Sequence, residues 1–498
     1  MAALTKSEFW IARVDDMTTL GMASSRATSP YVPRLSYLSS GKVLFLLDLL
    51  AVLGLTPLTI WLGNRVGFIP DPAGFVLFPL ANLLLLFAMG LYRRDAMISL
   101  RRALARVPLV VGMGIVVAVM ATLLLNAATG WLLPSPIDWN NLAAQSTLAE
   151  AEFILAAILA RAVFRLLVHR GVLHRYLLVV GAGERAWDLL HMLGKEGSRL
   201  HDDVVFLHDA ALGALDPRLE ADPRVRIVVG LSVLQAALAS DADQIVVAPD
   251  ERRGMDLERL LTCKKSGFPV VQYLSFVEKE IRRVDLKRME LGWLLYSDGF
   301  RFNLVDRILK RAFDLVVSTF VLAVMSPFLL LAMAAIRFEG PGSILYRQTR
   351  VTRDGQPFQI LKLRTMRVDA EAGGAVWARK NDDRITAVGR FLRRARIDEL
   401  PQLLNILKGE MSFVGPRPER PEFVAQLIAT IPLYNERHMV KAGLTGWAQI
   451  NYPYGASVDD ARSKLSYDLY YVKNFSILFD VVILLQTLRV VLWPSGVR

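Results

Sequence analysis

The sequence predicts a mixed α/β membrane protein with an N-terminal four-helix transmembrane bundle, a Rossmann-like α/β domain, and a C-terminal α/β domain that carries a re-entrant membrane helix. The first observation is composition. Of the 498 residues, 53% are hydrophobic and mean hydropathy is +0.35, which is too apolar for an ordinary soluble enzyme, whereas 21% charged residues are too many for a chain buried wholly in lipid. The second is that several apolar runs are long enough to cross a bilayer. The third is that short β-branched runs alternate with helical stretches further along the chain.

The chain is strongly basic, with 59 Lys and Arg against 47 Asp and Glu and a formal net charge of +12. This balance suits nucleic acid, an anionic membrane surface or phosphorylated substrates. Because apolar runs are present, we expect the membrane and phosphates as partners and no nucleic acid. Cys263 is the only cysteine, which excludes a disulfide framework and a cysteine-based zinc site and fits a reducing compartment.

The first 170 residues contain the predicted bundle. Residues 1–40 are polar and rich in Ser, Thr and Pro, so we expect a flexible tail rather than a cleavable signal peptide. The bundle itself, at 41–170, is indicated by four apolar runs, which are 42–62, 74–92, 107–128 and 148–168. The last run is the weakest because it carries or borders four charged residues, which are Glu150, Glu152, Arg161 and Arg165. Arginines crowd the second connection and follow the fourth run, so by the positive-inside rule both ends of the bundle face the cytoplasm.

The Rossmann-like domain is predicted at 171–252. Its candidate strands are 176–180, 204–207, 225–229 and 244–248. The first strand is followed by GAGERA, residues 181–186, which has the G-x-G-x-x-A form of a dinucleotide-binding turn, and Asp209 is a candidate ribose ligand. The alternative is that the glycines only make the tight turn and let the helix pack on the strand, in which case no nucleotide binds.

Two further segments are interpreted from their charges. Residues 253–303 are predicted to be a linker region with a helical piece near 255–266 and a strand near 269–273. The charged run 278–290 is interpreted as a solvated face or linker. Near the C-terminus, the apolar run 475–493 has three polar interruptions, which are Asp480, Gln486 and Arg489. They favour a helix that lies at the membrane interface over one that spans the bilayer.

A fifth apolar run, 313–336, is long enough to span the bilayer but has basic residues on both flanks. A simple crossing would place one of these flanks on the wrong side of the membrane. Pro327 lies near the middle and removes a backbone hydrogen bond, at a cost of roughly 3 kcal/mol in a regular helix. We therefore predict a re-entrant helix broken at Ser326-Pro327, with the Ser326 hydroxyl as a partner for the freed backbone groups. The alternative is an ordinary kinked spanning helix.

The candidate chemistry lies in the segment 393–419. Asp398 and Glu399 are adjacent carboxylates that follow a basic run, and Arg417 comes later between prolines. A carboxylate needs a cationic clamp or a metal to approach an anionic phosphate, because like charges repel. In the extended segment LKLRTM, Lys362 and Arg364 alternate onto one face, which suits anionic oxygens. The plain alternatives are carboxylates that interact with the dipole of the next helix and a solvated strand face.

Four segments in order carry a resemblance to a known family: KRAFDLVVSTFVLAVMSPFLLLAMAAIRFEGPGSILYRQTR, LKLRTM, RRARIDELPQLLNILKGEMSFVGPRPE and KAGLTGWAQINYPYGASVDDARSKLSYDLYYVKN. The chain resembles the bacterial sugar transferases, which are polyprenol-phosphate hexose-1-phosphate transferases of the monotopic phosphoglycosyl transferase type. The resemblance covers about 304–493, and the N-terminal parts resemble those of the large members. It implies a monotopic catalytic domain at 304–498.

The resemblance also implies roles for residues of this chain. Asp398 matches the nucleophile, and Glu399 matches the dyad glutamate that helps to hold Mg²⁺. The matching phosphate- or substrate-binding positions are Lys362, Arg364, Arg417 and Asp468. The matching membrane positions are Lys310 and Arg311, a basic pair at the level of the lipid headgroups, and Ser326 and Pro327 at the helix break.

The implied reaction moves hexose 1-phosphate from a UDP-sugar, UDP-glucose or UDP-galactose, to undecaprenyl phosphate. It proceeds through an aspartyl-phosphosugar intermediate, releases UMP, and begins exopolysaccharide, O-antigen or capsule assembly. The implied location is the bacterial inner membrane with the catalytic domain facing the cytoplasm, and a homodimer is a reasonable expectation. The competing hypotheses are a catalytically inactive, nucleotide-sensing membrane scaffold and a glycosyltransferase that releases UDP.

The chain departs from the family pattern at a few positions. Thr352 stands where we expect glycine, and Ala442 stands where we expect proline. Ala395 and Arg396 stand where small hydroxyl residues are frequent. None of these departures removes a catalytic group, and they leave the sugar preference open.

Overall fold

The computed structural model describes most of the 498-residue chain, in two compact units, Met1–Ile281 and Arg282–Arg498, which are described separately below. The described ranges are 11–12, 38–65, 72–98, 110–116, 119–120, 139–197, 202–223, 225–253, 255–289, 299–300, 303–367, 383–452, 455 and 457–492.

The first unit contains the apolar helices α3 (Ser40–Arg65), α4 (Pro72–Ala88) and α8 (Trp139–His169), and the short helix α5 (Arg94–Ile98) lies between α4 and α8 in the chain. Helices α3 and α4 both pack against α8 through a shared apolar core. They correspond to the first, second and fourth predicted runs, whereas most of the third run, 107–128, lies outside the described residues. By length and composition, α3 and the later α15 are the described helices that are apolar enough to cross a bilayer.

Three of the four charged residues of the fourth run, Glu150, Glu152 and Arg161, have partners on the neighbouring helices. Polar groups at bilayer depth are costly unless they are paired, and these pairs explain how α8 tolerates its charges. The contacts are Asn82 to Glu150 at 2.9 Å, Thr56 to Glu152 at 2.7 Å, and Arg161 to Asp48 at 2.5 Å.

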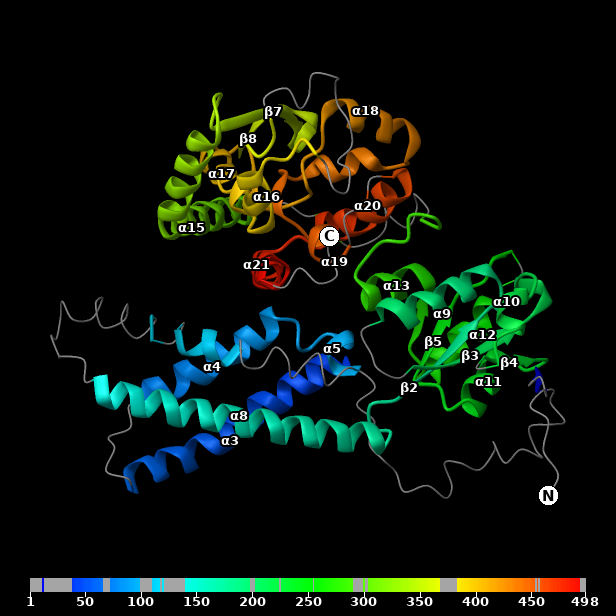
Figure 1. The fold of residues 1–498 in the computed structure, drawn as a ribbon. Helices are drawn as coiled ribbons and strands as arrows, with labels where there is room; N and C mark the ends of the chain where they lie inside the picture. Colours follow the sequence, from blue (N-terminus) through cyan, green and yellow to red (C-terminus); the bar gives the residue numbers. More distant parts are fainter. Residues whose placement is uncertain are drawn as a thin grey trace, which may run out of the picture. The chain divides into compact units, whose positions relative to one another are not determined.

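A parallel sheet in the order β1-β4-β3-β2-β5-β6 follows in the first unit (Figure 1). Its strands are β1 (Ile11–Ala12), β2 (Arg175–Val180), β3 (Asp202–His208), β4 (Arg226–Val229), β5 (Gln244–Val247) and β6 (Val270–Gln272). The helical elements are α9 (Glu184–Glu196), η1 (Ala210–Leu212), α10 (Pro217–Glu220), α11 (Val233–Ala239), α12 (Leu257–Lys265) and α13 (Tyr273–Ile281). Helix α9 contacts α13, and α11 contacts α12, in two separate pairs.

The predicted strands from 176 to 248 all form. The sheet also extends past the predicted boundary at 252, because Val270 and Val271 of β6 pair with the open edge of β5. The helical piece and the strand predicted near 255–266 and 269–273 both form, as α12 and β6, but they belong to the sheet domain and not to a linker, and α13 follows them. Within the predicted tail, Ile11–Ala12 pair with β4.

The second unit begins with the long helix α15 (Leu304–Glu339) and the antiparallel hairpin β7 (Leu345–Val351) and β8 (Pro357–Leu363), which turns through η2 (Arg353–Gly355). The next elements are α16 (Ala387–Arg394), η3 (Ile397–Glu399), α17 (Gln402–Lys408) and β9 (Ser412–Val414). The last are α18 (Pro421–Thr430), η4 (Tyr434–Met439), β10 (Gly443–Thr445), α19 (Trp447–Asn451), α20 (Val458–Lys473) and α21 (Ile477–Leu492).

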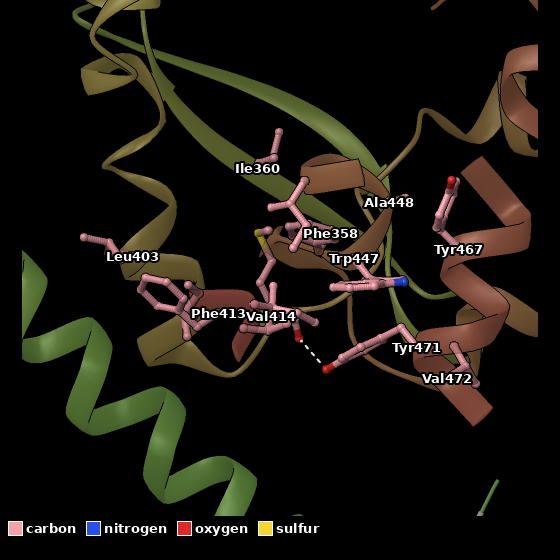
Figure 2. Packing of buried hydrophobic residues seen from close by; sticks show 14 residues of the cluster. Phe358, Ile360, Leu403, Phe413, Val414, Trp447, Ala448, Tyr467, Tyr471 and Val472 are labelled. Carbon is pink, nitrogen blue, oxygen red and sulfur yellow. Dashed lines mark hydrogen bonds between the residues drawn. The ribbon is translucent and has the colours of Figure 1, made fainter. Parts of the chain in front are cut away.

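Figure 2 shows the main core of this unit, in which aromatic side chains of α19 and α20 pack against β9 and α17. The polar ends of these aromatic side chains are satisfied. The Tyr471 hydroxyl donates to the Val414 carbonyl at 3.1 Å, and the Trp447 indole donates to the Arg282 carbonyl at 2.8 Å. Two short parallel strands, β9 and β10, lie beside this core and lead into the candidate site.

Helix α15 is continuous across Pro327, so the predicted break takes the form of a bend between two limbs, which Figure 1 shows. Proline cannot donate a hydrogen bond to the Ala323 carbonyl, and the Ser326 hydroxyl donates to that oxygen instead at 2.8 Å. This partner for the freed carbonyl was predicted and is confirmed. One side of α15 packs on the unit, and most of its other apolar side chains are exposed, among them Phe320, Phe328 and Leu331.

The basic pair at the start of α15 anchors this helix within the unit. Lys310 forms an ion pair with the buried Asp480 of α21 at 2.6 Å. Arg311 donates to the Ile406 and Leu407 carbonyls at 2.6 and 2.7 Å, close to the end of α17, where helical carbonyls lack partners. These contacts engage both charges inside the fold and anchor the start of α15 there. They also explain Asp480, which interrupts the last apolar run because it faces the core.

Candidate active site

The carboxylate dyad lies where α16, η3 and α17 follow one another. Helix α16 packs closely on the end of β8, because Gly389 leaves room for the Thr365 carbonyl, which a Cβ would approach to 2.2 Å. Arg396 then adopts a left-handed conformation, with φ of 59°, and turns the chain into η3. For a residue other than glycine this conformation costs about 1 to 2 kcal/mol, which places backbone strain directly before the dyad.

Glu399 is held by two cations from different elements. Its Oε1 atom accepts from Arg417 at 3.0 Å and lies 3.3 Å from Nζ of Lys362, on β8. Burial opposes ionisation of Glu399, but the charges of Arg417, Lys362 and Arg396 outweigh it, so the pKa of this carboxyl is strongly lowered. Glu399 is therefore a fixed negative charge. Three of the predicted residues, Lys362, Glu399 and Arg417, are in contact here.

Asp398 lies in a different environment from Glu399. The residue is only 8% exposed, and its Oδ1 atom is buried without a hydrogen-bond partner among the described residues. Burial, together with the neighbouring Glu399 charge, raises the pKa of Asp398 to about 6. Asp398 and Glu399 lie in η3, just before α17, where the alternative of an interaction with the helix dipole also placed them, but neither carboxylate caps this helix through a hydrogen bond.

The residues present fit a magnesium ion. Within the described ranges no group of three or more His, Cys, Asp or Glu side chains is arranged to hold a metal. Mg²⁺ does not need such a group, since it is commonly bound by one or two carboxylates and completes its shell with water and substrate phosphates. The unpartnered Oδ1 of Asp398, adjacent to the ionised Glu399, is an oxygen donor of this kind.

Asp468 lies behind the site and supports Arg417 indirectly. Its carboxylate accepts from the Arg437 guanidinium at 2.7 Å, and both side chains are at most 5% exposed. Arg437 also donates to the backbone carbonyl of Arg417 at 3.1 Å and to the Tyr434 hydroxyl at 2.7 Å. Sequence reasoning missed Arg437, because a single arginine 31 positions before its partner carries no local signal.

Arg364 does not join Lys362 at the dyad. Strand β8 ends at Leu363, and Arg364 donates to the Ile336 and Gly340 carbonyls at 3.3 and 3.0 Å, at the end of α15. Of the two cations that were predicted to share one face of the strand, only Lys362 therefore lies at the dyad. The structure instead brings Arg350 of β7 close to the Arg417 loop, where it donates to the Pro418 carbonyl at 3.1 Å.

Two departures from the family pattern contact each other. The Ala442 amide donates to the Thr352 hydroxyl at 3.1 Å, and that hydroxyl donates to the Glu410 carbonyl at 3.0 Å. A proline at 442 would have no amide hydrogen, and a glycine at 352 would have no hydroxyl. The two replacements therefore supply the donor and the acceptor of one buried hydrogen bond, which lies directly before β10 and contributes to the structure rather than to the site.

The glycine-rich turn of the first unit is filled by a side chain of the chain itself. Both carboxylate oxygens of Asp250 accept from the first amides of α9, Glu184 at 2.6 Å and Arg185 at 3.1 Å. A Cβ at Gly183 would come within 1.9 Å of Asp250, so the glycine is needed for this approach. Asp209, the candidate ribose ligand, accepts from the Ala211 amide at 3.0 Å and caps η1. This arrangement favours the structural interpretation of the motif.

The dyad, in which two cations hold Glu399 and Asp398 is buried, lies in the unit that begins with the apolar helix α15. The family model described as bacterial sugar transferase matches residues 305–494. Similar proteins from several bacteria have names that state a function. The chain is 45% identical over 180 residues, or 36% of its length and 67% of the relative, to the UDP-glucose:undecaprenyl-phosphate glucose-1-phosphate transferase of Caulobacter vibrioides. The chain therefore belongs to the bacterial sugar transferase family.

Other relatives name more than one sugar. The UDP-N-acetylgalactosamine-undecaprenyl-phosphate N-acetylgalactosaminephosphotransferase of Aeromonas hydrophila is 38% identical over 266 residues, 53% of this chain and 61% of the relative. The UDP-glucose:undecaprenyl-phosphate glucose-1-phosphate transferase of Escherichia coli is 42% identical over 185 residues, 37% of this chain and 40% of the relative. In these two relatives the matched part is thus less than two thirds of their length.

Proposed function

We propose that the chain transfers a sugar 1-phosphate from a UDP-sugar to undecaprenyl phosphate, releases UMP, and begins polysaccharide assembly at the cytoplasmic face of the bacterial inner membrane. The observation that supports this most is the unequal dyad, in which Glu399 is held ionised by Arg417 and Lys362 while Asp398 is buried with an unpartnered oxygen. The names of the relatives support glucose or N-acetylgalactosamine as the sugar. UDP-galactose, the other sugar expected from the sequence, has no support from the relatives named above.

In the proposed reaction Asp398 acts as the nucleophile. A carboxylate oxygen of Asp398 bonds to the sugar-linked phosphorus, the bond between the two phosphates breaks, and UMP leaves with the electron pair. A phosphate oxygen of the polyprenyl acceptor then bonds to the same phosphorus, and the Asp398 carboxylate is released. This divides one difficult transfer into two steps.

The cations around the dyad make the approach of anions feasible. Lys362 and Arg417 both contact Glu399, and their charges also lie where substrate phosphate oxygens would come close to Asp398. Asp398 and Glu399 would hold Mg²⁺, which when bound offsets negative charge on the phosphates. Arg437 acts as a positioning residue, since it contacts the backbone of Arg417 rather than the dyad, and Asp468 holds Arg437 in turn.

The proposed membrane arrangement keeps the four N-terminal spans and the re-entrant α15. The bend at Pro327 and the exposed apolar side chains of both limbs of α15 support a helix that enters one leaflet and returns. Single cysteines are placed on either side of 313–336 in a Cys263→Ser background and tested for labelling by a membrane-impermeant thiol reagent. This labelling distinguishes a re-entrant helix from a kinked spanning helix. Labelling of only one flank from outside the cell would reject the re-entrant proposal.

Product analysis tests the proposed reaction. The full chain in a membrane mimetic is incubated with undecaprenyl phosphate, Mg²⁺ and UDP-glucose, UDP-N-acetylgalactosamine or UDP-galactose. We expect UMP and a lipid-linked diphosphate sugar from at least one donor. Release of UDP would instead indicate a glycosyltransferase, and no nucleotide product from any donor would indicate the inactive scaffold.

The pKa of Asp398 predicts an acid limb in the pH profile of kcat/KM. Because attack needs the ionised carboxylate and the pKa is raised to about 6, activity at low Mg²⁺ should fall as pH decreases through this value. A bound cation favours the charged carboxylate, so raising Mg²⁺ should move the limb to lower pH. Steady-state UMP release at several Mg²⁺ concentrations measures this, and a limb that stays in place at all of them would contradict the proposed metal site.

A further inference from the structure

An open groove of about 630 Å³ lies between the second limb of α15 and the start of β7. Its lining combines apolar and cationic side chains, and none of its described lining residues is acidic. The apolar residues are Met333, Ile344 and Leu345, and the cations are Arg337 and Arg347. A groove of this composition suits a molecule with an anionic head and an apolar body.

The groove lies on the face of β7 opposite the dyad. Side chains of a strand alternate between its two faces, so Leu345 and Arg347 share one face and Tyr346 shares the other with Arg350. Tyr346 is paired across the hairpin with Lys362, which contacts Glu399. The groove is therefore separated from the catalytic carboxylates by the hairpin itself, and a ligand in it would not occupy the place of the nucleotide sugar.

The two arginines of the groove contribute no side-chain contact to the described part of the fold. Among the residues that the structure describes, neither Arg337 nor Arg347 has a hydrogen bond or an ion pair through its side chain, and both are exposed. The acidic residue closest in sequence, Glu339, instead accepts from the Val388 amide at 2.9 Å. Two arginines at one groove without an internal counter-charge are complementary to an external anion.

The groove also lies at the end of the apolar surface of α15. Leu330, Leu331 and Phe338 are 65%, 69% and 89% exposed, and they lie on the same limb as Met333 and Arg337. If this surface is embedded in lipid, as the proposed re-entrant arrangement requires, the groove lies where the helix leaves the hydrocarbon. Arginine at this level meets phosphate headgroups, while the apolar part of the groove remains in contact with acyl chains.

We propose that this groove binds an acidic phospholipid of the surrounding membrane, with its phosphate between Arg337 and Arg347 and the upper part of an acyl chain against Met333, Ile344 and Leu345. The occupant is a resident lipid rather than the polyprenyl acceptor, because the groove faces away from the dyad. The proposal rests on the proposed membrane insertion of α15 and does not require the transferase reaction.

Lipid retention tests this without turnover. The full chain is reconstituted in vesicles of equal parts phosphatidylglycerol and phosphatidylcholine, extracted in mild detergent without nucleotide sugar, and its bound lipids are measured by mass spectrometry. We expect enrichment of phosphatidylglycerol on the unchanged chain. Arg337→Gln and Arg347→Gln should each reduce this enrichment roughly fivefold, since one basic residue near an anionic surface contributes about 1 kcal/mol.

Arg353→Gln is the matched control. Arg353 is an exposed arginine on the turn of the same hairpin, but it is paired with Asp354 at 3.1 Å and lies outside the groove. Its replacement should leave the enrichment unchanged. The proposal is overturned if the double variant of Arg337 and Arg347 retains the same lipid ratio. It is also overturned if added undecaprenyl phosphate displaces the retained phosphatidylglycerol, which would assign the groove to the acceptor.

Discussion

Asp398→Asn should abolish UMP release and the covalent phosphosugar adduct. The amide has the size of the carboxylate but lacks the negative oxygen that attacks phosphorus, so the loss should be on the order of a thousandfold or more. Steady-state UMP assays give the rate, and intact-protein mass spectrometry after mixing with UDP-sugar alone detects the adduct. Near-normal turnover in this variant would overturn the assignment of the nucleophile.

The folding of this variant can be judged separately. The Oδ1 atom of Asp398 is buried without a partner among the described residues, so replacing the carboxylate by a neutral amide should not lower stability. Asp354→Asn is the matched control, because Asp354 is 69% exposed on the β7-β8 turn and tolerates asparagine in its left-handed conformation, with φ of 58°. Activity and the unfolding midpoint of this control should both stay close to those of the unchanged chain.

Arg437→Met should lower the free energy of unfolding by about 3 to 5 kcal/mol. The change leaves Asp468 buried without its ion-pair partner, at 2% exposure of the side chain. It also removes the donor that contacts the Arg417 carbonyl, so kcat/KM should fall as well. Thermal or denaturant unfolding of the reconstituted chain gives the first quantity, and UMP release at sub-saturating donor gives the second.

A double variant separates these two effects. Replacing both partners, Arg437→Met with Asp468→Leu, removes the unpaired charge and should recover most of the lost stability. It cannot restore the contact with the Arg417 carbonyl, so kcat/KM should remain low. Full recovery of activity together with stability would show that the ion pair has no positioning role. Arg353→Met, at a surface pair, should change stability by less than about 0.5 kcal/mol.

The elements of the fold were largely predictable because their patterns are local. Buried parallel strands appear as continuous β-branched runs, and the strands predicted at 176–180 and 244–248 formed at those places. The proline in α15 and its hydroxyl partner follow from backbone chemistry within four residues. The β6 strand was predicted near 269–273 but was assigned to a linker, because its place in the sheet depends on the edge of β5, with which it pairs.

The site was predictable where one motif holds all its parts and unpredictable where distant residues meet. Asp398 and Glu399 are neighbours, and the resemblance supplied Lys362 and Arg417, which reach the same carboxylate oxygen. Arg364 differs from the expectation because its strand ends one residue earlier. Lys310 pairs with Asp480, 170 positions away, and no spacing rule connects such residues before the chain is folded.

Asp250 gives the sheet domain a tethered substitute for a ligand. A domain that depends on a diffusing nucleotide gains stability according to the ratio of ligand concentration to Kd, so its folding varies with the metabolic state of the cell. A carboxylate built into the chain is present at a fixed effective concentration and binds the α9 amides whether or not nucleotides are abundant. The sheet domain thereby gains this stabilising contact independently of any ligand concentration.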